Sequence, residues 1–343
     1  MRCLLVHVDG KLPNLALMAL SAWLKAEGHD VTFTSKVTPE LGDQHYDKVY
    51  ASAIFTKSAP LVEQLLKWWP EAEVGGTWRN LRGPNNEDLN PKISDIVPAQ
   101  FTELDYSAYP RFSSSLGFTQ RGCRFSCSFC FVPWKEGRPN TFSSIDSIWR
   151  GQGHPKQLHI LDNDFFGSPE WPDRIEEIRH GKFKVCLNQG INLRIISDKQ
   201  AAALATIEYR NDAFSRRMLY TAFDNLQDHR VFFRGVDRLA EHGIPSSHLM
   251  SYMLVGYEKD ETWERVWLRF NAMVERKIKP YVMVHEDAKL RRDGEGSPTW
   301  KDLRALARWV NMGLYRRIPD FRDYRVSFKT SRHVPDPRQM SLM

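Results

Sequence analysis

Three cysteines in one short segment are the residues of this sequence whose types and spacing point most directly to chemistry. They are Cys123, Cys127 and Cys130, in a C-x3-C-x2-C arrangement that directly follows a predicted strand. Three thiolates on one loop can hold three irons of a [4Fe–4S] cube, and the fourth iron then stays open to a substrate or cofactor. A structural zinc site usually needs four ligands, often as two cysteine pairs. Since the only other cysteines, Cys3 and Cys186, lie far apart in the sequence, an iron–sulfur cluster is the better interpretation.

The composition is that of an ordinary globular protein. The chain has 343 residues, 48 Lys and Arg against 42 Asp and Glu, a formal net charge of +6 and 42% apolar residues. Five cysteines in a chain of this length do not make the disulfide framework of a small secreted domain. The longest mostly apolar stretch, residues 15–24, covers about half of a membrane span, and the first residues do not form a signal peptide. We therefore expect a cytoplasmic protein without a membrane anchor.

The first part of the chain alternates between strand and helix patterns. Strands are expected at 3–8, 31–34 and 49–55, and helices at 14–26 and 60–69. Repeated β-α-β units with short links imply a parallel sheet covered by helices, so residues 1–78 are predicted to form a Rossmann-like α/β domain. Residues 79–113 are rich in Gly, Asn and Pro, which predicts an irregular linker.

A second series of strands and helices follows the linker. Six strands are expected, at 115–119, 157–161, 184–188, 218–223, 250–255 and 280–285. Helices are expected between and after them, at 144–150, 171–180, 199–209, 231–242, 262–276 and 300–315. Six β-α units in series favour a (βα)6 partial TIM-type barrel over residues 114–290, followed by a C-terminal helical tail at 291–343. A doubly wound open sheet is the alternative, because periodicity alone does not distinguish the two.

The cysteine spacing, with the aromatic Phe129 directly before the third cysteine, resembles the radical S-adenosylmethionine (radical SAM) superfamily. In that family the cluster loop follows the first strand of such a barrel, and the resemblance covers roughly residues 113–290. It implies that the three cysteines ligate the cluster and that the open iron chelates the methionyl amine and carboxylate of S-adenosylmethionine. It also implies reductive cleavage to a 5′-deoxyadenosyl radical that abstracts hydrogen from a substrate. A low-potential electron donor of the flavodoxin or ferredoxin type would then be a partner.

In such a barrel the functional side chains lie at the carboxyl ends of the strands. After the second strand, Asp162 and Asn163 stand where the family has a glycine-rich amine-binding motif, so Asp162 or nearby carbonyl groups could hold the ammonium group. After the third strand, Arg194 is placed to pair with the cofactor carboxylate through two parallel hydrogen bonds. Gln189 and Asn192 are placed to bind ribose hydroxyls.

Later strand ends supply the remaining candidates. The resemblance implies that Phe129 of the cysteine loop packs near the cluster and the adenine. Gly256, after the fifth strand, is expected to let the backbone approach the adenine. Asp224, His285 and Glu286 are candidates to touch the substrate or to act as acid or base. The sequence does not name the substrate, and nucleic acid, a peptide and a small metabolite all stay open.

The cysteines and the N-terminal motif of this sequence distinguish between types of enzyme within the family. Methylthiotransferases carry three upstream cysteines for a second cluster, whereas here only Cys3 precedes the loop. Residues 1–78 resemble a cobalamin-binding domain at Gly75-Gly76, but Asp9 is followed by Gly10-Lys11 without the usual histidine, and about one β-α unit is missing. We therefore expect no tightly bound cobalamin. A cobalamin-dependent radical SAM methylase and a radical enzyme that modifies nucleic-acid bases are the alternatives.

The alternative outside enzymes is a zinc-stabilised nucleic-acid-binding protein. Its support is the basic C-terminal segment, in which arginines alternate with aromatic residues that could stack on bases. These residues are Arg304, Arg308, Trp309, Tyr315, Arg316, Arg317, Arg322, Tyr324, Arg325, Lys329 and Arg332.

Overall fold

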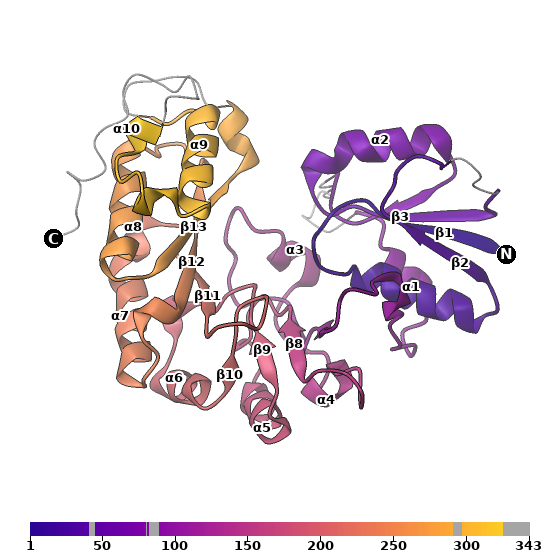
Figure 1. Ribbon diagram of the computed structural model, residues 1–343, viewed down its shortest axis with the longest axis horizontal. Coiled ribbons are helices and arrows are strands. Elements are labelled where there is room, and N and C mark those ends of the chain that lie inside the picture. Colours follow the sequence, from indigo (N-terminus) through magenta and orange to yellow (C-terminus); the bar gives the residue numbers. More distant parts are fainter. Residues whose placement is uncertain (41–44, 80, 82–88, 291–296, 325–343) are drawn as a thin grey trace. The chain divides into compact units, whose positions relative to one another are not determined.

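The computed structural model describes residues 1–40, 45–79, 81, 89–290 and 297–324 (Figure 1). The chain divides into two compact units, Met1–Ser113 and Ser114–Met343. Both are mixed α/β structures built on parallel strands, as predicted. The tail residues Arg325, Lys329 and Arg332 lie outside the described residues.

The first unit is a four-stranded parallel sheet in the order β2-β1-β3-β4. Its strands are β1 (Arg2–His7), β2 (Asp30–Thr34), β3 (Lys48–Ser52) and β4 (Glu73–Gly75). Its helices are α1 (Leu15–Ala26) and α2 (Ala59–Trp68), with the 3-10 turns η1 (Thr56–Ser58), η2 (Ile93–Ile96) and η3 (Tyr106–Ala108).

The alternation of side chains along β1 explains why the first unit has two cores. Leu4 and Val6 pack in one cluster with residues of α2, whereas Leu5 packs in another cluster with Leu17 of α1. The two helices accordingly cover opposite faces of the sheet (Figure 1). The segment expected as an irregular linker belongs to this unit, because Ile93 is buried in the α1-side cluster.

The second unit contains the six predicted strands, all confirmed within a few residues of their expected bounds. They are β5 (Ser115–Gly117), β8 (Gln157–Ile160), β9 (Lys184–Cys186), β11 (Leu219–Ala222), β12 (Leu249–Val255) and β13 (Lys279–Val284). Neighbours pair in parallel as β5-β8-β9 and β11-β12-β13, and a parallel bridge between Ile191 and Thr221 lies between the two groups. Three short strands were not predicted: β6 (Gln120–Arg121), β7 (Asn140–Thr141) and β10 (Glu208–Tyr209).

Helices and turns follow the strands of the second unit along the chain. The helices are α3 (Val132–Glu136), α4 (Ile145–Ile148), α5 (Trp171–Gly181), α6 (Asp198–Ala205), α7 (His229–Glu241), α8 (Trp263–Glu275), α9 (Trp300–Asn311) and α10 (Phe321–Tyr324). The 3-10 turns are η4 (Leu193–Ile195), η5 (Leu226–Asp228), η6 (Ser246–His248), η7 (Glu286–Leu290) and η8 (Leu314–Arg316).

The two faces of the strands in the second unit meet different surroundings. Leu219 and Leu249 belong to the large cluster formed with the helices, whereas Tyr220 and Met250 belong to a small separate cluster with Cys186. Residues on both faces of these strands are therefore mostly buried, which explains why the strands are rich in apolar residues.

Helix α9 covers the outer edge of β13. The side chain of Asn311 accepts a hydrogen bond from Val282 N at 2.7 Å and donates one to Val282 O at 2.9 Å. An edge strand leaves such groups unpaired and invites association with other chains, so the helix satisfies and blocks this edge. Trp309 of the same helix is 1% exposed, and Tyr315 and Tyr324 pack against the core. Trp309 is therefore a core residue, and Tyr315 and Tyr324 are partly buried against the core, so none of the three is a free stacking platform.

Candidate functional site

The cysteine loop connects β6 to α3. Cys123, Cys127 and Cys130 are free and half-buried, and Cys130 N donates to Cys127 O at 2.9 Å in a tight turn. The pKa of Cys123 is raised to about 11, mainly by burial, with smaller contributions in the same direction from Asp164, Cys130 and Cys127. Burial also raises the pKa of Cys130, with contributions from Cys127, Asp224 and Glu136. The thiols therefore lie close enough to interact, and a bound cation would stabilise their deprotonated form.

An ion pair ties the cysteine loop to the turn that follows β8. Arg124 donates to the carboxylate of Asp164 from Nε at 2.7 Å and from Nη2 at 2.8 Å. The backbone N–H of Arg124 donates to the same carboxylate at 3.1 Å. The Asp164 side chain is only 4% exposed, and bidentate pairing fixes the orientation of both groups. This contact places the first half of the loop at the carboxyl end of the second predicted strand.

A second ion pair holds the other side of the loop. Glu136, at the end of α3, accepts from Arg121 Nη2 at 2.5 Å and from Gly122 N at 3.1 Å. Asn163 Nδ2 donates to the same carboxylate at 3.2 Å, so this candidate cofactor residue here serves the loop. Burial alone would raise the pKa of Glu136, but the hydrogen bonds and charge of Arg121 lower it overall. Glu136 therefore stays ionised and ties the end of α3 to the start of the loop at Arg121 and Gly122.

Gly122 is required by the geometry of the loop. Its φ is +85°, and a Cβ at this position would lie 2.4 Å from Arg138 O and 2.8 Å from Gly137 O. Cys123 N donates to Gly137 O at 3.1 Å in the same place. The two strands of the loop thus approach each other more closely than any side chain would permit.

Asp162 supports the strand end rather than facing an open site. It is 3% exposed, and its carboxylate accepts from Thr119 N at 2.7 Å, from the Thr119 hydroxyl and from Gln120 N at 3.3 Å. Burial raises its pKa to about 6, although these hydrogen bonds favour the ionised form. Both carboxylate oxygens are occupied by these donors.

Arg194 lies against the cysteine loop. Its guanidinium carbon is 4.9 Å from the ring centre of Phe125, which lies between Cys123 and Cys127. Arg194 Nη1 pairs with Asp228 at 3.0 Å, and Asn192 Oδ1 accepts from Arg194 N and Nε at 3.1 Å each. The candidate carboxylate-binding arginine is thus half-buried, oriented by Asn192, and paired with a carboxylate of the chain itself.

Aromatic rings connect the loop to the last two strands. Phe129 contacts Tyr257 edge-to-face at 5.5 Å, and Tyr257 contacts His285 in the same manner at 4.9 Å. Tyr257 follows β12 and His285 follows β13. The cysteine loop and the carboxyl ends of β12 and β13 are therefore linked by consecutive ring contacts. Sequence reasoning missed Tyr257, although its place one residue after Gly256 was a usable signal.

Gly256 has a different environment from the expected one. A Cβ on Gly256, whose φ is +84°, would lie 2.5 Å from Ala288 Cβ and 2.9 Å from Leu303 Cδ1. The side of Gly256 on which a side chain would stand therefore faces the core and not an adenine site. Gly256 N donates to Glu261, which pairs with Arg269. The side chains of Glu261 and Arg269 are 3% and 2% exposed.

Asp224 lies beside this buried pair, at the end of β11. Its Oδ1 accepts from Leu254 N at 2.8 Å, and its backbone carbonyl accepts from Arg269 Nη1. Burial raises its pKa, while the positive charges of Arg269 and Arg194 lower it in part. Since Asp224 also influences the pKa of Cys130, this candidate carboxylate lies near the loop.

Two candidates are not brought into these contacts. Glu286 is exposed and lies 3.8 Å from the Lys289 ammonium group. Gln189 is exposed at the turn after β9.

The donor set fits a cubane cluster in its chemistry. Within the described residues, no group of three or more His, Cys, Asp or Glu side chains has the arrangement that one metal ion needs. Three thiolates that bind three different irons stand farther apart than three ligands of one ion. Free, half-buried thiols on one anchored loop are the donors that such a cluster takes.

The carboxyl edge of the sheet in the first unit is closed by the chain itself. The Asp9 carboxylate accepts from Ile54 N at 2.8 Å and from Phe55 N at 2.9 Å. Gly76 N donates to Pro91 O at 3.1 Å, and a Cβ on Gly76 would lie 2.1 Å from Ala53 O. Pro91, in the segment that the sequence predicted to be a linker, thus packs onto the Gly75-Gly76 turn, which resembles part of a cobalamin site.

Comparisons with known proteins add little to these observations. No family model matches the chain, and no curated protein matches it. Among solved structures, a mutant of spore photoproduct lyase is similar, with a TM-score of 0.36, 11% sequence identity and coverage of 95% of this chain and 96% of that chain. At this TM-score and identity the likeness carries no argument about fold or function. No helix of the described residues is long and apolar enough to cross a membrane.

Proposed function

We propose that this protein is a radical SAM enzyme that uses a [4Fe–4S] cluster held by Cys123, Cys127 and Cys130. The observation that carries the proposal is the cysteine loop itself, with three free half-buried thiols on a loop tied down by Arg124–Asp164 and Arg121–Glu136. When bound, the cluster supplies one electron to S-adenosylmethionine, whose reductive cleavage gives the radical that attacks the substrate.

The fold that we propose for the second unit is a (βα)6 partial barrel. Its support is the parallel register of the six strands, the Ile191–Thr221 bridge, and an inner cluster that includes Cys186, Tyr220 and Met250. The cysteine loop then lies at the carboxyl end of the strands, where such barrels hold their reacting groups. We propose a Rossmann-like fold for the first unit on the order β2-β1-β3-β4.

The residues around the loop take separate roles in this proposal. Arg194 binds the cofactor carboxylate by exchanging its present partner Asp228, and Asn192 holds the guanidinium in orientation. Phe129, backed by Tyr257, offers an apolar edge to the adenine. Asp162 anchors the turn at Thr119 in this proposal, so backbone carbonyl groups bind the ammonium group of the cofactor. Asp224 and His285 remain the proposed substrate-side groups.

Reductive cleavage of the cofactor tests this function. Anaerobic protein with a strong reductant is expected to convert S-adenosylmethionine to 5′-deoxyadenosine and methionine, slowly even without substrate. Arg194→Ala is expected to weaken cofactor binding by about 1.5–3 kcal/mol, the value of a charged hydrogen bond. Arg179→Ala, which removes an exposed arginine of α5, is the control and should bind the cofactor normally. Absence of 5′-deoxyadenosine from protein that holds its cluster would refute the proposal.

We propose that the first unit does not bind cobalamin, because Asp9, Gly76 and Pro91 use its carboxyl edge for contacts within the chain. A large cofactor needs a formed cavity that covers most of its surface. Protein reconstituted with cobalamin should lose the visible absorbance on desalting. Retention of one cobalamin per chain would favour the radical methylase instead.

We propose a flavodoxin or a ferredoxin as the electron donor. Zinc in place of iron in the purified protein would favour the alternative of a zinc-stabilised nucleic-acid-binding protein.

A further inference from the structure

Helix α7 presents a row of arginines on one face. Arg230, Arg234 and Arg238 follow each other at four-residue spacing, which places successive side chains about 6 Å apart along the helix axis. The opposite face carries buried residues of the core, including Phe232, Phe233, Val236 and Leu239. We call Arg230, Arg234 and Arg238 the arginine stripe.

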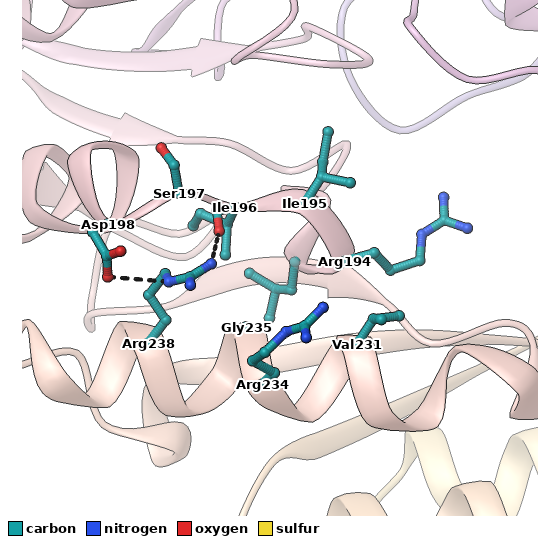
Figure 2. Close-up of a pocket in the computed structure, with 10 residues that line it drawn as sticks. Arg194, Ile195, Ile196, Ser197, Asp198, Val231, Arg234, Gly235 and Arg238 are labelled. Carbon is teal, nitrogen blue, oxygen red and sulfur yellow. Dashed lines mark hydrogen bonds and ion pairs between the residues drawn. The ribbon is translucent and has the colours of Figure 1, made fainter.

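The arginine stripe has more positive charge than its neighbours balance. Arg238 pairs with Asp198 and donates to Ile196 O (Figure 2). Arg230 and Arg234 are both exposed, and neither has an acidic partner within the part of the chain that the structure describes. The pKa of the adjacent His229 is lowered first by burial and then by the positive charges of Arg276 and Arg230. The N-terminal half of α7 therefore carries a local excess of positive charge.

A pocket beside the arginine stripe continues this surface towards the cysteine loop. The pocket has a volume of about 380 Å³ and lies between the 193–198 segment and α7, with Arg194, Arg234 and Arg238 among its lining residues (Figure 2). Gly235 permits the close approach of these elements, since a Cβ there would lie 2.1 Å from Leu193 O. Arg194 at one end of the pocket also contacts Phe125 of the cysteine loop.

We propose that the arginine stripe binds the sugar–phosphate backbone of a nucleic-acid strand. The three arginines are spread over about 12 Å of the helix axis, and those at 230 and 234 are free of acidic partners in the described residues, which matches a linear chain of phosphates better than a single compact anion. Guanidinium groups suit phosphate oxygens geometrically, and such contacts hold a strand without reading its sequence. The further claim that the bound strand is the substrate rests on the proposed radical function, whereas the binding itself does not.

Binding of a fluorescent single-stranded 20-mer, followed by anisotropy across a salt series, tests this proposal on the full-length protein. Each phosphate contact with a single strand contributes about 0.7 to the slope of log K against log salt. Arg230→Gln/Arg234→Gln should therefore lower the slope by about 1.4 and weaken binding about 25-fold at 0.1 M salt. The matched control is Arg111→Gln/Arg179→Gln, which removes two exposed arginines elsewhere and should bind as the wild type does.

Three results would overturn the proposal. They are no binding of the oligonucleotide at 0.1 M salt, equal affinity of the stripe and control variants, and equal competition by inorganic phosphate or a free mononucleotide, which would indicate a simple anion pocket. Iron content and cofactor cleavage without substrate should be normal in the stripe variant. Failure of oligonucleotide binding is thus separable from failure of the radical chemistry.

Discussion

Replacing Gly122 by alanine tests whether the cysteine loop is held as closely as the structure shows. A non-glycine residue at a φ of +85° costs about 1–2 kcal/mol. The new Cβ would also lie 2.4 Å from Arg138 O, and this oxygen belongs to backbone that cannot swing away. Relief by moving residues 137–138 costs about 1–3 kcal/mol for overpacking and about 1 kcal/mol for the Cys123–Gly137 hydrogen bond.

Gly313 provides a control outside the loop. Its φ of +70° and ψ of +18° lie in the left-handed region, and a Cβ there would meet no atom within 4 Å. Gly313→Ala should therefore cost only the backbone strain, less about 0.4–1 kcal/mol gained from a stiffer unfolded chain. We expect Gly122→Ala to be less stable than Gly313→Ala by about 2–4 kcal/mol.

Urea unfolding followed by tryptophan fluorescence measures this difference, and iron content after anaerobic reconstitution reports on the site. Gly122→Ala should lose most of its iron, and Gly313→Ala should keep it. Equal unfolding midpoints and equal iron contents in the two variants would refute the close approach of the two strands of the loop.

Three further outcomes are expected. Asp164→Ala removes both hydrogen bonds to the Arg124 guanidinium and should lower the free energy of unfolding by about 2–4 kcal/mol and reduce the iron content. The control Asp146→Ala, at an exposed carboxylate, should do neither. Equal iron contents in the two variants would contradict the anchoring role of Asp164. Arg269→Met breaks the buried ion pair with Glu261 and should lower the free energy of unfolding by about 3–5 kcal/mol. The double variant Arg269→Met/Glu261→Leu should recover part of this loss, because no unpaired charge is then buried. No recovery in urea unfolding would argue against an unpaired Glu261 as the cause. Burial lowers the pKa of His159 to about 4, below its unfolded value of about 6.5, so its contribution is present above pH 6.5 and is lost as pH falls towards 4. Relative to His159→Leu, the wild type should lose about 3 kcal/mol over that interval, and parallel pH profiles would show that His159 is not buried in neutral form.

The fold was predictable where side-chain burial leaves a regular pattern. Most residues of β11, β12 and β13 are apolar, and α8 begins and ends beside its capping residues Thr262 and Arg276, as its apolar period indicated. The helix predicted over 300–315 ends earlier, at Asn311, because Gly313 takes a φ of +70° and turns the chain. The helix predicted over 199–209 was wrong at its end, where Glu208 and Tyr209 pair with β9 as a two-residue strand too short to leave a pattern.

The segment 79–113 shows what composition leaves out. Its Gly, Asn and Pro residues indicated turns correctly, but not that Ile93 fills the core beside α1. A single apolar residue between turn residues has no periodicity, so only the tertiary structure reveals its burial.

At the site, the cysteine spacing and the polar strand ends were visible in the sequence, but their pairing was not. Arg124 and Asp164 are 40 residues apart, and they meet only because β5 and β8 pair in parallel with Ser115 opposite Leu158. Glu136 likewise reaches Arg121 because α3 folds back beside β6. Such partners follow from strand register, which a single sequence does not determine.

The cluster content of the purified protein tests the central claim most directly. Anaerobically purified or reconstituted protein is expected to contain about four irons and four acid-labile sulfides per chain, the content of one cubane. Cys123→Ala, Cys127→Ala and Cys130→Ala should each lose the cluster, and Cys186→Ala, which alters a fully buried thiol elsewhere in the unit, should retain it. A colourless protein without iron, or an iron content unaffected by the three loop substitutions, would contradict the account.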